Sequence, residues 1–211
     1  MMLITFEGPD GSGKTTQIQK LKQKLESLGY RVLVTREPGG TPMAEQIREL
    51  LLEKREEQVF GETEMFLYAG ARSQHARVVI QPALEQGYVV LSDRYIDSSL
   101  IYQGVGRGLG IELVRLVNEA AIGGLWPQRT YLLDIGDNEA RTRMRGRAGE
   151  PDRLELENAA FHQSIREGYL ALQRREPERM RLIDASRAPE LVEEEIWEDM
   201  VDLMAERKAP L

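Results

Sequence analysis

A short apolar run, a glycine-rich turn and a helical pattern follow one another near the beginning of the sequence. Residues 2–6 (MLITF) predict a buried strand, and apolar residues recur at helical spacing from 18 to 28. Between them, residues 8–15 (GPDGSGKT) satisfy the pattern G-x-x-x-x-G-K-[ST]. Glycines allow a backbone to wrap around an anion with its N–H groups pointing inward. The sequence therefore predicts a strand–loop–helix unit whose loop binds the phosphate groups of a nucleotide.

Each residue type in this loop has a chemical reason to be there. The helix that begins near Lys14 adds the positive end of its dipole, Lys14 brings a positive charge to the outer phosphates, and Thr15 offers a hydroxyl to Mg²⁺. A chance glycine-rich turn is the alternative, and it is disfavoured because strand, helix and Lys-Thr pair occur together. The residues predicted to bind the nucleotide are Gly8, Pro9, Asp10, Gly11, Ser12, Gly13, Lys14, Thr15 and Thr16. GTPases, ATPases and kinases share the motif, so it does not define the reaction.

Short apolar runs alternate with amphipathic ones along the rest of the chain. Further strands are predicted over 31–35, 88–92, 131–135 and 181–183, and helices over 63–85, 111–122, 154–174 and 189–206, with another beginning near Thr41. Pro82 is expected to kink or shorten the helix that contains it. This alternation predicts five parallel strands covered by helices on both faces. Together with the loop motif, it predicts a three-layer α/β fold of the P-loop NTPase type. The length of 211 residues predicts one domain, with a small lid at about 141–152.

Composition excludes several classes of protein. The chain has 28 basic and 35 acidic residues, so its net charge of −7 argues against a nucleic-acid coat protein. The absence of cysteine excludes disulfides and thiolate chemistry. Apolar runs are far shorter than the ~18 residues of a membrane span, and no secretory signal pattern opens the sequence. We expect a cytoplasmic protein with no nucleic-acid or membrane partner, and structural roles for His75 and His162.

Charged residues follow two of the predicted strands. Asp93 comes directly after the third strand, and the carboxyl ends of parallel strands face the ligand crevice, so Asp93 is predicted to bind Mg²⁺. The alternative for Asp93 is a cap of the following turn. Arg36, after the second strand, and Arg94 are predicted to grip the phosphate of a second substrate. Taken singly, each of these arginines is more often a surface residue.

Arginines also alternate in a later segment, at 141, 143, 145 and 147. A spacing of two does not build one face of a helix. A loop that closes over phosphates and an exposed basic helix end are equally consistent with this segment. Tyr68 and Arg72 lie four residues apart on a predicted helix, where they could contact a base. From these two residues alone, a core tyrosine and a surface arginine are the preferred interpretation.

Taken together, these motifs resemble those of the bacterial thymidylate kinase family over essentially the whole chain. The residues that carry the resemblance are 8–15, 36–41, 69–75, 93–95, 97–99, 102–104, 106–108 and 152–155. The resemblance implies transfer of the γ-phosphoryl group of ATP to dTMP, giving dTDP and ADP in dTTP biosynthesis. It further implies Mg²⁺ as cofactor and a homodimer.

The resemblance also implies a role for individual residues. Asp10 would lie near the sugar and phosphate of dTMP, and Arg36 and Arg94 would hold that phosphate. Tyr68 stands where the family usually has Phe, stacking on thymine, and Arg72 would bind its carbonyl edge. Ser99, Tyr102 and Gln103 would line the nucleoside pocket, with Tyr102 crowding the 2′ position. Lys14, Thr15 and Asp93 would bind ATP and Mg²⁺.

A catalytic arginine occurs in some family members within the phosphate-binding loop, but residues 9–12 contain no basic side chain. The chain resembles the class that supplies this arginine from the lid, with Arg143 and Arg147 as the leading candidates. The rival interpretations are a kinase for another nucleotide or deoxynucleoside, and a nucleotide-sensing switch that binds but scarcely turns over. Tyr68, Arg72 and Tyr102 bear on the first rival, and ADP production that depends on dTMP would exclude the second.

Overall fold

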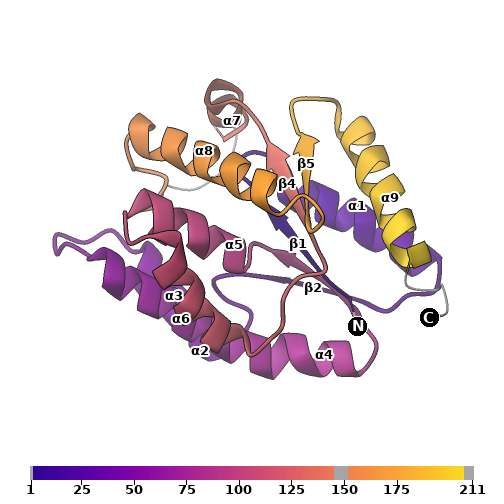
Figure 1. The fold of residues 1–211 in the computed structure, drawn as a ribbon, viewed down its shortest axis with the longest axis horizontal. Coiled ribbons are helices and arrows are strands. Elements are labelled where there is room, and N and C mark those ends of the chain that lie inside the picture. The colour runs from indigo at the N-terminus through magenta and orange to yellow at the C-terminus, as the bar shows by residue number, and fades with distance from the viewer. Residues whose placement is uncertain (1, 145–151, 207–211) are drawn as a thin grey trace.

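Five parallel strands form the centre of the computed structural model, which describes residues 2–144 and 152–206 (Figure 1). In chain order they are β1 (Met2–Glu7), β2 (Val32–Arg36), β3 (Val89–Asp93), β4 (Arg129–Asp134) and β5 (Met180–Asp184). Their order within the sheet is β2-β3-β1-β4-β5, and each neighbouring pair is parallel. The predicted parallel sheet is thus confirmed, and the carboxyl ends of all its strands meet at one edge.

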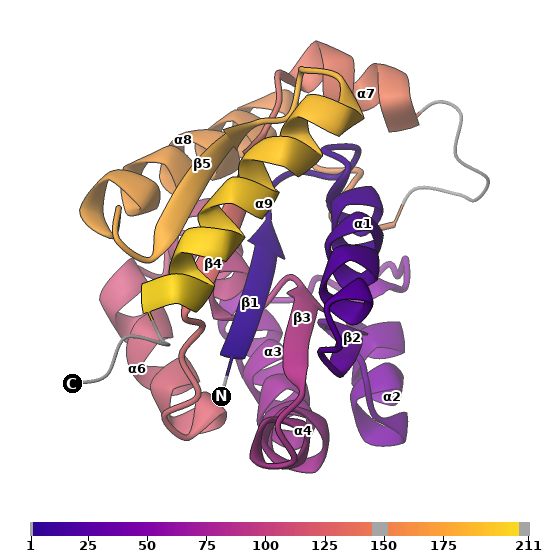
Figure 2. The ribbon, with the colours of Figure 1, turned by 90° about the vertical axis from the view of Figure 1, so that its right-hand side faces the viewer.

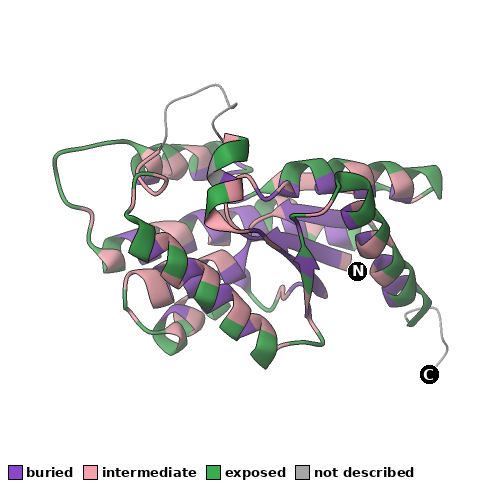
Figure 3. Ribbon diagram, turned by 90° about the horizontal axis from the view of Figure 1, so that it is seen from above, coloured by how far each residue is buried: buried purple, intermediate pink, exposed green. Residues whose placement is uncertain are grey.

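Side chains of the central strands alternate between two apolar cores, one on each face of the sheet. Leu3 and Val90 belong to one core, whereas Ile4 and Leu91 belong to the other. Strands that are covered on both faces are apolar along their whole length, which explains the apolar runs in the sequence. Figure 3 shows these strands as buried segments between helices whose outer faces are exposed.

Helices cover the two faces unequally. On one face, α1 (Lys14–Ser27) packs against α9 (Pro189–Glu206). Figure 2 views the sheet from the side on which these two helices lie. The other face carries α3 (Gly61–His75), α4 (Gln81–Glu85), α5 (Ile96–Ser99), the π-helical η2 (Leu100–Gly106), α6 (Ile111–Ile122) and α8 (Ala159–Arg175). Of the remaining helices, α2 (Pro42–Leu52) packs on α3, and α7 (Asp137–Met144) follows β4. Within 2–144 and 152–206, no helix is long and apolar enough to cross a bilayer.

The helix predicted over 63–85 is divided into three segments. After α3 the chain forms a π-helical turn, η1 (Ala76–Ile80), and only then α4, with Pro82 in its first turn. Proline has no N–H and its ring collides with the preceding turn, so a regular α-helix does not continue through it. Pro82 was expected to kink or shorten this helix, and in the structure the helix changes from α to π just before the segment that contains the proline.

The helix predicted from residue 154 begins later, at Ala159. The side chain of Asn158 accepts a hydrogen bond from the Phe161 N–H at 2.9 Å and so caps this helix. Before it, Asp152 accepts from the N–H groups of Leu154 and Glu155 and forms a turn of its own. A second difference concerns residues 96–106, for which the sequence pattern predicted no helix and which form α5 and η2.

Candidate active site

The loop after β1 has a backbone that requires glycine at two positions. Gly8 has a φ of 131° and Gly11 a φ of 81°, both in the region that favours glycine. A Cβ on Gly8 would lie 2.3 Å from the carbonyl oxygen of Leu133, and one on Gly11 would lie 2.7 Å from that of Ala140. The loop therefore passes close to β4 and α7, and Pro9, partly buried, lies between these two contacts.

Lys14 is the first residue of α1, and its side chain turns back over the loop. Its buried Nζ donates to the carbonyl oxygens of Gly8 and Pro9, each at 3.0 Å, and lies 3.7 Å from Oδ1 of Asp10. Burial and the neighbouring charge of Arg94 lower the pKa of Lys14. The ammonium group is thus held at the mouth of the loop, where phosphate oxygens could replace the carbonyls as its partners.

Three further residues, Ser12 in the loop and Thr15 and Thr16 at the start of α1, offer hydroxyl groups. Ser12 is buried, and in the part of the chain that the structure describes its Oγ has no hydrogen-bond partner. Gly13, with a φ of 91°, leads into α1, where Thr15 and Thr16 are exposed. Thr15 Oγ1 donates to Oδ2 of Asp93 at 3.1 Å. A hydroxyl and a carboxylate are oxygen ligands of the kind that Mg²⁺ prefers, so this pair fits the predicted metal site.

A second pocket lies beside the loop, and we call it the acceptor pocket. Its lining residues are Asp10, Glu37, Pro38, Arg48, Leu52, Tyr68, Arg72, Arg94, Ser98, Ser99, Tyr102, Gln103, Asp152, Leu154 and Glu155. Six of the seven residues predicted to bind the second substrate are among them, together with Asp10 of the loop. The fold therefore brings together residues that follow β1, β2 and β3 with residues of α2, α3, α5 and η2 and of the segment after residue 151.

Arg94 connects the loop with this pocket. Its Nη2 donates to Oδ1 of Asp10 at 3.0 Å, its Nη1 donates to Oγ of Ser98 at 3.3 Å, and its guanidinium lies 5.4 Å from the ring centroid of Tyr102. Its backbone has a φ of 67°, which is uncommon outside glycine and is found at functional sites. The backbone N–H of Arg94 donates to the carbonyl of Phe6 at 2.9 Å, which helps to hold this conformation.

Arg72 is buried, so the preferred interpretation of it as a surface residue is wrong. Its Nε donates to Oε2 of Glu37 at 2.7 Å, and its Nη2 donates to the carbonyl of Tyr95 at 3.0 Å. Its Nη1 donates to Ser99 Oγ at 2.8 Å and also to Asn118 Oδ1. These partners fix the guanidinium at the wall of the acceptor pocket. An arginine held in this way meets a ligand in one orientation only.

Two tyrosines contribute rings to the pocket. Burial raises the pKa of Tyr68, which lies one turn before Arg72, and raises that of Tyr102 to about 12. The Tyr102 ring packs edge-on against Tyr169 and Phe161, with centroid distances of 6.4 and 6.2 Å. Both phenols therefore keep their protons at neutral pH, and the position of the Tyr102 ring is fixed by its aromatic neighbours.

Two predicted arginines, Arg36 and Arg143, do not line this pocket. Arg36 is exposed, with its Nη1 donating to the carbonyl of Pro38 and its Nη2 to Oε2 of Glu45, each at 2.8 Å. Arg143, in the last turns of α7, pairs with Glu139 at 2.6 Å. Arg147, with residues 145–151 of the expected lid, lies outside the described residues, as does the side chain of Arg141.

Glu7 is a residue of this site that the sequence patterns did not indicate. It is fully buried and accepts from the Tyr95 N–H at 2.8 Å, from Ser98 Oγ at 2.6 Å and from Tyr169 Oη at 2.8 Å. It thereby ties the end of β1 to the segment that carries Arg94. A charged residue at the end of an otherwise apolar strand was a signal that could have identified it.

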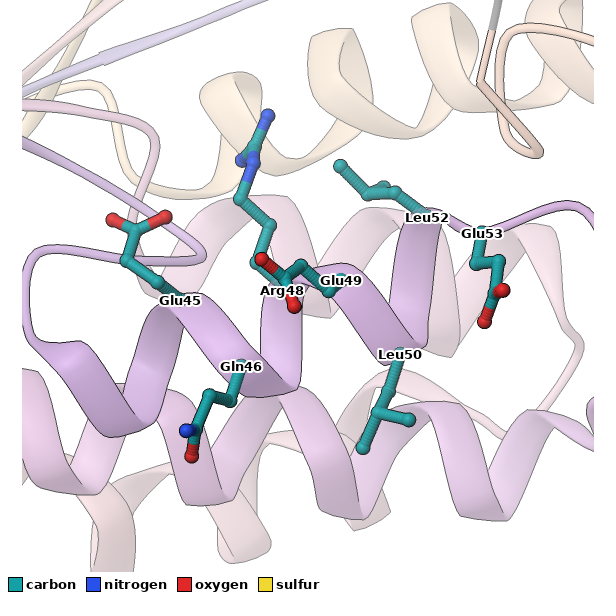
Figure 4. A pocket seen from close by; sticks show the side chains of 7 residues that line it. All are labelled: Glu45, Gln46, Arg48, Glu49, Leu50, Leu52 and Glu53. Carbon is teal, nitrogen blue, oxygen red and sulfur yellow. The ribbon is translucent and has the colours of Figure 1, made fainter.

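Arg48 was also missed. It extends from α2 on the same side of the helix as Leu52, away from Gln46 and Leu50 (Figure 4). Its Nη1 donates to the carbonyl of Pro38 at 3.0 Å, and the side chain lines the acceptor pocket. Burial, together with the charge of Arg36, lowers its pKa. No spacing pattern in the sequence distinguishes this half-buried arginine from the exposed residues of the same helix.

Comparisons with known proteins show which family this chain is similar to. The family model for thymidylate kinase matches residues 6–196. A thymidylate kinase of Bacillus pumilus is 47% identical over 204 residues, which span 96% of either chain. That of Pelotomaculum thermopropionicum is 52% identical and covers 90% of this chain and 88% of its own. The crystal structure of thymidylate kinase from Ehrlichia chaffeensis superposes with a TM-score of 0.75 at 31% identity, covering 94% of this chain and 98% of that one.

Proposed function

The chain belongs to the thymidylate kinase family, and we propose that its phosphate-binding loop and acceptor pocket bind the two substrates of the family's reaction. The enzyme transfers the γ-phosphoryl group of ATP to dTMP, yielding ADP and dTDP for nucleotide biosynthesis. The pair formed by Asp10 and Arg94 carries this assignment, because it joins the loop of one substrate to the pocket of the other at 3.0 Å. Donor and acceptor phosphates would meet at that junction.

Catalysis by these residues would consist mainly of alignment and charge stabilisation. The attacking oxygen of the dTMP phosphate is anionic at neutral pH, so no strong general base is required. Lys14, Arg94 and Arg36 would offset the repulsion between two polyanions that must approach in line. For this, Arg36 would first have to break its ion pair with Glu45 and then bind the phosphate of dTMP. Arg143 and Arg147 remain the proposed sources of positive charge from the lid.

Within the loop, residues 8–16 would hold the phosphates of ATP. The buried Ser12 hydroxyl supports this role, because a buried donor without a partner is rare and suits a phosphate oxygen. Thr15 and Asp93 would hold Mg²⁺, which usually binds one or two protein ligands and the substrate phosphates. When bound, the ion supplies charge that stabilises the transferring group.

In the acceptor pocket, the base of dTMP would lie between Tyr68 and Arg72. The ring of Tyr68 would stack on thymine, and Arg72 would donate to a carbonyl of the base. Ser99 and Gln103 would complete the base site. Tyr102 would crowd the 2′ position of the sugar, because its ring is held between Tyr169 and Phe161. This crowding would favour deoxyribose.

The remaining expectations concern organisation. We propose a single kinase domain over 1–211 with a lid at about 141–152, and a cytoplasmic location, where ATP and dTMP occur. A homodimer is supported by the exposed apolar side chains of Phe66, Leu113 and Leu116, which stand on the packed pair α3 and α6. Apolar groups gathered on a surface suit a contact with another subunit.

A panel of nucleoside monophosphates tests the function. ADP formation from ATP would be measured in the presence of Mg²⁺, with dTMP, dUMP, dCMP, dGMP, dAMP or the ribose analogue of dTMP as the acceptor. We expect dTMP to give the highest kcat/KM. Preference for another monophosphate would identify a different nucleotide kinase. ATP binding without turnover that depends on an acceptor would instead support a nucleotide-sensing switch.

A further inference from the structure

Three segments meet at the buried carboxylate of Glu64, a residue that the transfer reaction does not use. Glu64 lies in α3, one turn before Tyr68, and is fully buried. Its Oε1 accepts from Nε2 of Gln103 at 2.7 Å and from Nε of Arg107 at 3.3 Å. Its Oε2 accepts from Nη2 of Arg107 at 3.2 Å and from Nη2 of Arg153 at 2.7 Å. A charge so deep in the protein requires a reason beyond packing.

The two arginines fix the orientation of this carboxylate. Arg153 is itself held, because its Nε donates to the carbonyl of Leu51 at 3.0 Å. Arg107 is held by Glu157, to which its Nη1 donates at 2.5 Å. Charged hydrogen bonds on both oxygens leave Glu64 little freedom to rotate. An ionised carboxylate only accepts hydrogen bonds, so the group that faces it must be a donor.

This requirement determines which end of the Gln103 amide enters the acceptor pocket. An amide carries a donor, Nε2, and an acceptor, Oε1, and either end can face a neutral partner. Because Glu64 accepts from Nε2, Oε1 lies on the opposite side of the amide. Gln103 lines the acceptor pocket together with Arg72, whose guanidinium carries donors only. Gln103 and Arg72 thus supply one acceptor and one donor group among the residues that line the pocket.

We propose that Glu64 is a positioning residue for base selection, because it holds the amide of Gln103 with its oxygen toward the acceptor pocket. The pocket is then complementary to a base edge with a ring N–H next to a carbonyl, as in thymine. Cytosine has a ring nitrogen that accepts a hydrogen bond next to an amino group that donates one. Its ring nitrogen would face the Gln103 oxygen, which is also an acceptor, and its amino group would face Arg72, which is also a donor. Such a mismatch leaves buried polar groups unpaired, which is costly. The proposal rests on the proposed function, which places a pyrimidine monophosphate in this pocket.

Glu64→Gln tests the proposal without changing the size of the side chain. Arg107 and Arg153 would attract the oxygen of the new amide, so its NH₂ would face Gln103 and turn the Gln103 amide around. We expect the ratio of kcat/KM for dTMP to that for dCMP to fall by at least about tenfold. Because the ratio is measured on one preparation, partial loss of folded enzyme does not move it. An unchanged ratio in folded E64Q would overturn the proposal.

Matched variants separate this role from a general effect on the helix. Glu64→Asp keeps a group that only accepts, and we expect it to retain most of the selectivity that E64Q loses. Glu62→Gln removes the charge of an exposed residue on the same helix and should leave the ratio as in the wild type. In a Q103L background, E64Q should have no further effect, because Glu64 acts through Gln103. A further loss of selectivity there would contradict the proposal.

Should E64Q fail to fold, the wild-type protein still provides a test. The side-chain NH₂ of Gln103, assigned by its disappearance in Q103L, would be followed by ¹⁵N NMR. We expect slow hydrogen exchange that is the same with and without dTMP, because Glu64 holds this group in both states. Exchange that becomes slow only on dTMP binding would show that the NH₂ faces the base and would refute the proposal. Absence of dTMP-dependent ADP formation by the wild type would instead refute the proposed function.

Discussion

The hydroxyl of Thr15 donates to the carboxylate of Asp93 at 3.1 Å, although 78 residues separate them in the sequence. The contact arises because β1 and β3 are neighbours in the sheet, with Phe6 in register with Asp93. The loop after β1 and the end of β3 therefore face the same crevice. Two residues that were predicted to bind Mg²⁺ on separate grounds are thus found in direct contact.

Asp93→Asn removes the negative charge of this pair and keeps its shape. We expect the Mg²⁺ concentration for half-maximal turnover to rise by about tenfold or more, because a charge-assisted contact is worth ~1.5–3 kcal/mol. The measurement is a Mg²⁺ titration at saturating ATP and dTMP. Gln19→Ala, on the exposed side of α1, is the control. An identical Mg²⁺ dependence for D93N and the wild type would place the ion elsewhere.

Lys14→Ala removes the ammonium group from the mouth of the loop. We expect turnover to fall by at least about a hundredfold, because one oriented charge contact can supply ~3 kcal/mol to the transition state. Lys22→Ala, which removes a lysine from the outer side of the same helix, should retain normal turnover. Steady-state rates of ADP formation measure both. Near-normal turnover of K14A would count against the role of the loop.

Tyr102→Ala opens space beside the expected position of the sugar. We expect the preference for dTMP over its ribose analogue, measured as the ratio of kcat/KM, to decrease. Tyr102→Phe keeps the ring between Tyr169 and Phe161 and should preserve the preference. If Y102A discriminated between the two sugars as strongly as the wild type, crowding by this ring would not be the cause.

Glu7 predicts a specific dependence of stability on pH. Burial and the neighbouring Asp97 carboxylate raise the pKa of Glu7 from 4.5 to about 7. The folded protein holds this proton more tightly than the unfolded chain, so the stability contributed by Glu7 is present below about pH 4.5 and is lost as the pH rises through about 7.

Glu7→Gln abolishes this dependence. Relative to the wild type, its free energy of unfolding should rise by up to about 3 kcal/mol between about pH 5 and about pH 8. Urea unfolding at both pH values measures the difference between the two proteins. A difference that stays constant across this range would mean that the fold does not raise the pKa of Glu7.

Much of the fold and of the site could be predicted because the signals are local. The loop motif, the apolar strands and the residues that follow them directly, such as Asp93, are fixed by neighbours in the sequence. In a parallel sheet, residues at strand ends are then brought to one edge. Arg94 reaches the acceptor pocket in this way. The other five predicted residues of the pocket lie on α3, α5 and η2, and their roles were implied by the family resemblance rather than by local signals.

The features that could not be predicted depend on contacts between distant segments. Arg72 is buried because Glu37, Ser99 and Asn118 surround it, and no local pattern indicates such a set of partners. The positive φ of Arg94 is supported by the contact of its N–H with Phe6, which lies in another strand. The sequence likewise places Pro82 inside a predicted helix, but its helical periodicity does not indicate that a π-helical turn will precede this proline.

A crystal structure with dTMP and a non-hydrolysable ATP analogue tests the central claim most directly. The account predicts that the analogue's phosphates contact the main-chain nitrogens of residues 8–15 and Nζ of Lys14, and that Arg94 contacts the phosphate of dTMP in the acceptor pocket. The two phosphate groups should lie in line across the Asp10–Arg94 pair. An analogue bound away from this loop, or dTMP bound outside the acceptor pocket, would contradict the account.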